Sequence, residues 1–141
     1  MSAPPATTVR YADVAEGDEL PPLDLPLTRS LIVATAIASR DYQDVHHDPD
    51  LAVDRGSPDI FMNILSTNGF VGRFITDWAG PDALLTGVSI RLGAPNYPGD
   101  TMAMTGVVSA TDDATRTVTV DVVGANSKGN HVTGHVTVVL P

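Results

Sequence analysis

The chain has 141 residues, 43% of them hydrophobic, and a formal net charge of −9 with only eight Lys and Arg. Its length suits one domain with a sizeable core, and its acidity argues against nucleic-acid or anionic-membrane binding, which requires a basic face. The absence of cysteine excludes disulfides, a thiol nucleophile and thiolate metal ligands. No apolar stretch approaches the ~20 residues that span a bilayer, and the N-terminus lacks the pattern of a signal peptide, so we expect a cytoplasmic protein.

The first part of the chain predicts an extended lead-in, an edge strand and a helix. Residues 1–22 are rich in proline and poor in large apolar residues, which indicates a flexible segment ahead of a single domain over residues 23–141. Leucines alternate over residues 23–27, where prolines are tolerated only in an edge strand. A helix is predicted over residues 31–39, with a Thr or Ser ahead of it as N-cap, and a short helical turn over residues 48–52.

A long central helix is predicted from residue 57 to residue 78. Ser57, Pro58 and Asp59 combine an N-cap, a proline at the first helical position and an acid in the first turn. A wide apolar stripe follows, and a Gly-Pro pair at residues 80–81 should end the helix. Two glycines inside the helix suggest that another segment packs closely against it.

After residue 82 the hydrophobic period changes from 3.6 to 2, which is typical of strands with one buried face. Alternating residues predict four strands, around residues 88–92, 102–104, 117–122 and 132–138. One buried helix wrapped by one curved antiparallel sheet accounts for this order, so the predicted class is α+β. Such a sheet covers only one side of its helix, and a second copy or a paralogue would cover the rest.

The residues most suited to catalysis follow the first predicted helix. Residues 40–49 read Arg-Asp-Tyr-Gln-Asp-Val-His-His-Asp-Pro and hold three carboxylates and two imidazoles. A water molecule held between an Asp and a His can be activated near neutral pH. A solvated polar loop is the alternative interpretation. A metal site is disfavoured, because adjacent residues rarely point at one ion and no separated ligands are apparent.

Two segments carry a family resemblance. Asp41 and His46 have the spacing of the acid and imidazole in a Gly-Asp-x-Asn-Pro-x-His motif, and residues 91–101 read Arg-Leu-Gly-Ala-Pro-Asn-Tyr-Pro-Gly-Asp-Thr, close to an Arg-Phe-x-x-Pro-x-x-x-Gly-Asp-Thr segment. Over residues 28–140 the chain thus resembles the MaoC-like branch of the hotdog fold, which includes the (R)-specific enoyl-CoA hydratases.

The chain also departs from that family. Arg40, Gln43 and Asp44 replace the Gly, Asn and Pro of the first motif, and Met62 and Asn63 stand where the family's central helix usually starts with a His-Gly pair. With these departures the chain looks closest to the small MaoC-like subunit of the heteromeric steroid enoyl-CoA hydratase of cholesterol side-chain degradation.

The resemblance implies an α+β hotdog fold and an enoyl-CoA hydratase subunit, which adds water to the α,β-double bond of a steroid side-chain CoA thioester. It makes Asp41 the base and His46 the second water contact and proton carrier. The backbone amide of Asn63 would face the thioester oxygen, and Arg73 and Arg91 are candidate contacts for the CoA phosphates. Coenzyme A is part of the substrate, and no cofactor or metal is expected.

A partner is implied as well. A larger MaoC-like subunit with an OB-like domain would complete a double hotdog, in a heterotetramer with two copies of each chain, and a thiolase-like aldolase would bind through that partner. Two alternatives stay open, namely a non-catalytic acyl-CoA-binding hotdog subunit and a hotdog acyl-CoA thioesterase.

The other ionisable residues are assigned secondary roles. Asp44, His47 and Asp48 are expected to support the pair or to be solvated. His131 and His135 lie on the same face of a predicted strand and are expected on a solvent face or in a subunit contact.

Overall fold

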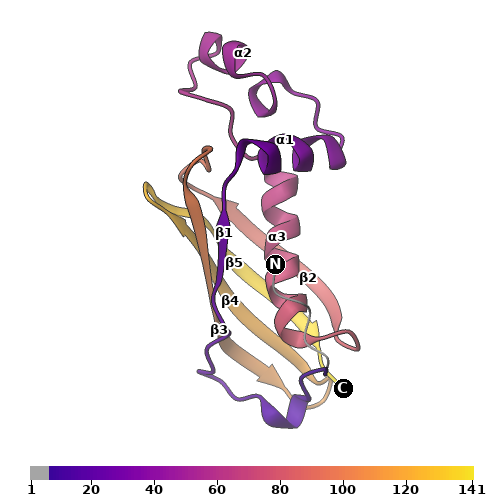
Figure 1. The fold of residues 1–141 in the computed structure, drawn as a ribbon. Coiled ribbons are helices and arrows are strands. Elements are labelled where there is room, and N and C mark those ends of the chain that lie inside the picture. Colours follow the sequence, from indigo (N-terminus) through magenta and orange to yellow (C-terminus); the bar gives the residue numbers. More distant parts are fainter. Residues whose placement is uncertain (1–6) are drawn as a thin grey trace.

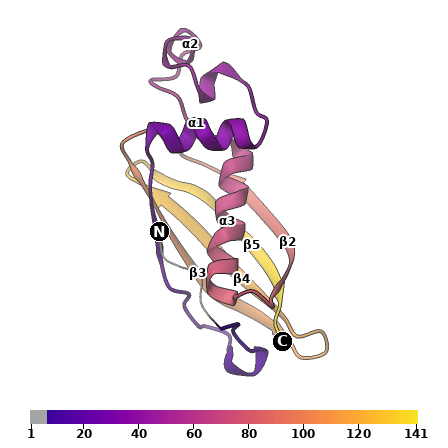
Figure 2. The same ribbon diagram turned by 45° about the vertical axis from the view of Figure 1, so that its right-hand side comes forward.

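A computed structural model describes residues 7–141 and consists of one curved antiparallel sheet with a long helix along its concave face (Figure 1). The sheet order is β1-β3-β4-β5-β2. Helix α3 lies against the sheet, α1 crosses the N-terminal end of α3, and α2 lies beyond α1 (Figure 2). The predicted α+β architecture is therefore confirmed. The elements are η1 (Tyr11–Asp13), β1 (Leu23–Pro26), α1 (Arg29–Ala38), η2 (Asp44–His46), α2 (Pro49–Asp54), α3 (Ile64–Ala79), β2 (Leu84–Leu92), β3 (Thr101–Asp112), β4 (Thr117–Asn126) and β5 (Gly129–Val139).

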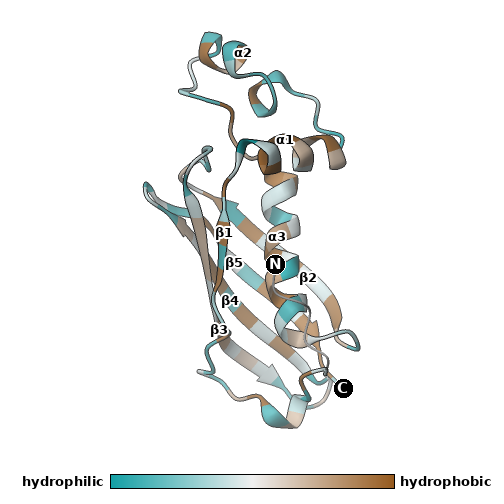
Figure 3. Ribbon diagram, viewed as in Figure 1, coloured by the Kyte–Doolittle hydropathy of each residue, from teal (hydrophilic) through white to brown (hydrophobic). Residues whose placement is uncertain are grey.

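The core lies between α3 and the inner face of the sheet, where apolar residues alternate along the strands (Figure 3). On β3 every second residue from Met102 to Val108 is buried, as the period of 2 predicts. Phe74 of α3 is 2% exposed and packs over Gly106, where a Cβ would come within 2.9 Å of the Phe74 ring. Burial of a side chain of this size contributes roughly 1.5–3 kcal/mol, so these contacts fix α3 on the sheet.

Helix α3 begins at Ile64, so the predicted start at residue 57 is wrong. The residues just upstream of it are not helical, because Phe61 N donates to Val45 O (3.2 Å) and Met62 N donates to Asn96 O (3.0 Å). The Asn63 side chain then caps the helix by accepting from Ser66 N at 3.0 Å. The predicted end is correct, since Gly80 follows the last turn with φ +90°.

The shorter helices agree with the sequence analysis. Thr28 is the N-cap of α1 and accepts from Leu31 N at 3.0 Å. Asp48 is the N-cap of α2 and accepts from the two N–H groups that follow Pro49. Strand β1 is an edge strand, as its prolines predicted.

Residues 7–22 follow the far end of the sheet and make contacts that the sequence analysis did not predict. Val9 N donates to Ala79 O, Tyr11 N to Pro141 O and Leu20 N to Gly106 O, at 2.9–3.0 Å. Leu20 is 5% exposed and joins the core. The first six residues of the segment predicted to be flexible lie outside the described part of the chain.

We expect Gly134→Ala to destabilise the fold. Gly134 pairs with Ile90 across β5 and β2, and a Cβ there would overlap the Ser89 carbonyl oxygen and lie 2.9 Å from Ile90 Cα. Those are backbone atoms, so the strands would have to separate, at roughly 1–3 kcal/mol. Gly69→Ala is the matched control, because its Cβ meets nothing within 4 Å and alanine favours a helix by up to about 1 kcal/mol. Urea unfolding would measure both, and a destabilisation by Gly69→Ala as large as that by Gly134→Ala would contradict the argument.

Candidate active site

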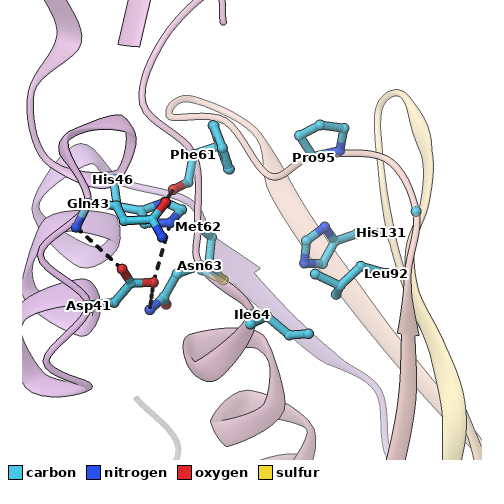
Figure 4. Close-up of a pocket in the computed structure, with 11 residues that line it drawn as sticks. Asp41, Gln43, His46, Phe61, Met62, Asn63, Ile64, Leu92, Pro95 and His131 are labelled. Carbon is cyan, nitrogen blue, oxygen red and sulfur yellow. Dashed lines mark hydrogen bonds and ion pairs between the residues drawn. The ribbon is translucent and has the colours of Figure 1, made fainter. Parts of the chain in front are cut away.

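The turn after α1 brings Asp41 and His46 together. Asp41 N donates to Ala36 O at 2.9 Å, which ends α1, and the short η2 helix then returns the chain toward the N-terminus of α3. The Asp41 Oδ2 and His46 Nε2 atoms face each other 3.4 Å apart (Figure 4). The two side chains are 19% and 8% exposed, so the pair is largely shielded from solvent.

The tautomer of His46 follows from its hydrogen bond. His46 Nδ1 lies 2.7 Å from the Phe61 carbonyl oxygen, which can only accept, so Nδ1 carries the proton. In the neutral ring Nε2 then presents a lone pair toward Asp41. The ring is also held edge-on by Phe61, with centroids 4.9 Å apart.

Asp41 is held as a carboxylate. Asn63 Nδ2 donates to Oδ2 at 3.0 Å, and Gln43 N donates to Oδ1 at 3.3 Å. The hydrogen bond from Asn63 is the main reason why the pKa of Asp41 lies below its ordinary value; the Gln43 amide and His46 add to this, while partial burial opposes it. When the His46 ring is neutral, Oδ2 and Nε2 are two acceptors that face one point, and a water molecule there can donate one hydrogen to each.

A pocket of about 350 Å³ opens beside this pair. It lies between the α1–α3 junction and the segment that joins β2 to β3 (Figure 4). The N-terminus of α3 contributes to one wall, so the positive end of the helix dipole is at the pocket. The lining residues are Asp41, Gln43, His46, Phe61, Met62, Asn63, Ile64, Leu92, Gly93, Pro95 and His131.

Comparison with known proteins identifies the family. The 3-oxo-4,17-pregnadiene-20-carboxyl-CoA hydratase beta subunit of Mycobacterium tuberculosis is 52% identical over 120 residues, which are 85% of this chain and 92% of the relative. The ChsH1–ChsH2 complex from M. tuberculosis contains a chain of 49% identity and TM-score 0.87, with 90% of this chain and 98% of that chain covered. A MaoC-like dehydratase matches with TM-score 0.87 at 28% identity, over 95% of this chain and 43% of its own. The chain belongs to the MaoC-like hydratase family. No family model matches the sequence.

The departures from the MaoC-like motif have visible structural consequences. Arg40, which replaces the motif glycine, adopts φ +56°, a left-handed conformation that favours glycine. Asn63 replaces the glycine ahead of the central helix and supplies both the cap of α3 and a donor to Asp41. Asp44 replaces the proline and pairs with Arg55 at 2.7 Å, which ties η2 to α2.

The remaining residues of the acidic-histidine cluster of this MaoC-like chain point elsewhere. His47 Nε2 lies 3.2 Å from the Tyr42 carbonyl oxygen on the surface, and Asp48 caps α2. Neither these two side chains nor that of Asp44 lines the pocket. In residues 7–141 no group of three acidic or histidine side chains is placed to share a metal ion. Nor is any helix of this described part long and apolar enough to cross a membrane.

The two arginines suggested for CoA binding lie outside the pocket and are not brought together. Arg73 pairs with Asp77 at 3.2 Å and lines a separate groove between α1 and α3. Arg91 is exposed on β2, next to the pocket residue Leu92. Gly69 also lines the groove and is open to it, so no segment of residues 7–141 packs there.

His131 corrects a sequence prediction. It is 2% exposed and lines the pocket, not a solvent face, because the register of β4 and β5 shifts between Gly124 and Ala125 and turns it inward. Its Nε2 lies 2.8 Å from Thr67 Oγ1, and its Nδ1 lies 2.6 Å from the Ala94 carbonyl oxygen. His135 is exposed, as expected. A period of 2 cannot reveal such a bulge, so no sequence pattern indicates a second pocket histidine.

Burial of His131 should make the stability of the protein depend on pH. Burial lowers the pKa of His131, although its hydrogen bond to the Ala94 carbonyl opposes the shift. The unfolded chain therefore binds a proton near pH ~6.5 while the folded chain does not, so stability falls as pH decreases below that value. We expect the loss of unfolding free energy between pH 7.5 and 5.5 to be smaller in His131→Gln. The matched control His135→Gln should retain the full loss, and equal losses in all three proteins would contradict this account.

Proposed function

We propose that this chain is the water-activating subunit of an enoyl-CoA hydratase that acts on the α,β-double bond of a steroid side-chain CoA thioester. One observation carries the proposal: the Asp41 carboxylate and the His46 imidazole face each other 3.4 Å apart in the lining of a pocket. The substrate class is supported by the 52% identity to a 3-oxo-4,17-pregnadiene-20-carboxyl-CoA hydratase beta subunit.

In the proposed reaction one water molecule donates its two hydrogens to Asp41 and His46. Its oxygen then has a lone pair free to attack Cβ, and the departing proton passes to the pair. Cα receives a proton from the same pair, so the hydroxyl and the hydrogen are added on one face of the double bond. The reaction needs no cofactor.

The thioester oxygen becomes negative as the water adds, and it requires fixed donors. The N-terminus of α3 supplies N–H groups and the positive end of the helix dipole at Asn63, on the pocket wall. We therefore assign the oxyanion contact to the backbone amide of Asn63. One such donor is typically worth about 2.7–4 kcal/mol in the transition state.

A second MaoC-like subunit is part of the proposal. The outer edge of β2 pairs with no strand within residues 7–141, and Ile64 and Leu65 at the start of α3 are each 53% exposed. The relative is a beta subunit, and the similar solved structure is a complex of two different chains. We infer a heterotetramer in which a larger chain with an OB-like domain covers these surfaces, with a thiolase-like aldolase bound through it. We place the assembly in the cytoplasm.

Loss of either member of the pair should strongly slow hydration. In the complex co-expressed with its partner, Asp41→Asn and His46→Ala should each lower kcat by about 10²–10⁴-fold, the usual contribution of a positioned acid or base. Asp44→Asn is the matched control, because that carboxylate faces Arg55 and should change kcat little. Wild-type turnover in both Asp41→Asn and His46→Ala would refute the proposal, and free CoA as the product would indicate a thioesterase instead.

A shorter thioester substrate that lacks phosphates tests whether Arg73 and Arg91 contact the CoA phosphates. If Arg73 and Arg91 contact the CoA phosphates, Arg91→Ala and Arg73→Ala should raise KM for the enoyl-CoA about fivefold each, as for other exposed charge pairs. Neither should alter KM for the N-acetylcysteamine thioester, which lacks phosphates. Arg10→Ala, which changes an exposed arginine at the start of η1, is the control. An equal rise in KM for both thioesters would show that the arginines act on structure only.

A further inference from the structure

We propose that the side chain of Asn63 is a positioning residue that fixes the Asp41 carboxylate opposite His46. The inference rests on the proposed function, since it assigns a task to a residue that acts through Asp41. It goes beyond the oxyanion contact, which concerns only the backbone amide of Asn63. The two tasks are separable, because a side-chain substitution leaves the backbone amide in place.

The orientation of the Asn63 amide is determined by its neighbours. Ser66 N, which can only donate, lies 3.0 Å from Oδ1, and the Ser66 hydroxyl also hydrogen-bonds Oδ1. The Nδ2 group must therefore point the other way, where it donates to Asp41 Oδ2 at 3.0 Å and to Ser39 Oγ at 2.9 Å. Both hydrogens of Nδ2 and both acceptor positions of Oδ1 are thus in use. At 2% exposure the side chain has no competing water contacts and little freedom to move.

Capping alone does not account for this arrangement. A serine, threonine or aspartate would cap α3 as well as asparagine does. A serine or threonine hydroxyl accepts and donates through one atom, whereas asparagine accepts from the helix through Oδ1 and donates to a carboxylate on its other side through Nδ2. Asn63 therefore connects three elements: the end of α1 through Ser39, the turn that carries Asp41, and the first turn of α3 through Ser66.

The same short segment fixes the other half of the pair. Phe61 accepts from His46 Nδ1 through its carbonyl oxygen, and two residues later Asn63 donates to Asp41. The remaining hydrogen bond of the Asp41 carboxylate is the longer contact from Gln43 N, at 3.3 Å. Without the Asn63 amide, the Asp41 carboxylate would have one 3.3 Å contact to hold its rotamer. The lowered pKa of Asp41, caused mainly by this hydrogen bond, is consistent with the role.

The decisive variant is Asn63→Asp, which keeps the shape and the cap but presents an acceptor to Asp41. Two adjacent carboxylates compete for one proton, so we expect the acidic limb of the kcat/KM pH profile to move to higher pH. We also expect kcat to fall about tenfold or more, as for loss of a hydrogen bond to a charged group, with KM little changed. Asn68→Asp makes the same charge change at an exposed position of α3 and should leave kcat and the profile unchanged.

Asn63→Ser completes the test if Asn63→Asp does not fold. Serine retains the cap, so the unfolding midpoint should stay close to that of the wild type while kcat falls and KM does not. A wild-type kcat and pH profile in whichever Asn63 variants fold would overturn the inference. This failure differs from failure of the proposed function. In the first case Asp41→Asn is inactive while the Asn63 variants are active, whereas in the second Asp41→Asn itself is active.

Discussion

The non-helical segment from Ile60 to Asn63 is the constraint on which the site depends. Its backbone is hydrogen-bonded on both sides, to Val45 O from Phe61 N and to Asn96 O from Met62 N. Ile60 and Met62 are buried, which anchors the segment in the core. In this conformation the Phe61 carbonyl reaches His46 and the Asn63 amide reaches Asp41. A helical conformation of the same residues would direct those groups into the helix and leave the pair without its partners.

The start of α3 and the chemistry of the pocket are therefore linked. If the helix began at Ser57, its N-terminus would lie seven residues, or about 10 Å, farther along its axis. The positive end of the dipole would then be remote from the pocket, since its effect is confined to the first turn. Because Asn63 caps the helix at the pocket wall, the same residue sets where the N–H groups point and where the Asp41 carboxylate lies.

Local sequence patterns predict most of the helices and strands. The predictions that are wrong fail because of contacts between segments that are distant in the sequence. The strands, α1, α2 and the pairing of Asp41 with His46 follow from periodicity, caps and motif spacing. The start of α3 does not, because strong helix signals at Ser57 are outweighed by backbone hydrogen bonds to distant segments. The inward position of His131 was missed because a one-residue register shift reverses the face that a side chain occupies.

The backbone of Arg40 is strained at the turn that positions Asp41. A left-handed conformation costs a non-glycine residue roughly 1–2 kcal/mol, and such strain persists only where the surroundings determine it. Here Arg40 N donates to Ile37 O and Asp41 N donates to Ala36 O, so the turn is held on both sides of the strained residue. The backbone of Asp41 is thus set by this turn, and its carboxylate by Asn63. In the proposed reaction the pair therefore needs little reorganisation when water binds, which is the condition under which electrostatic contacts contribute most to a rate.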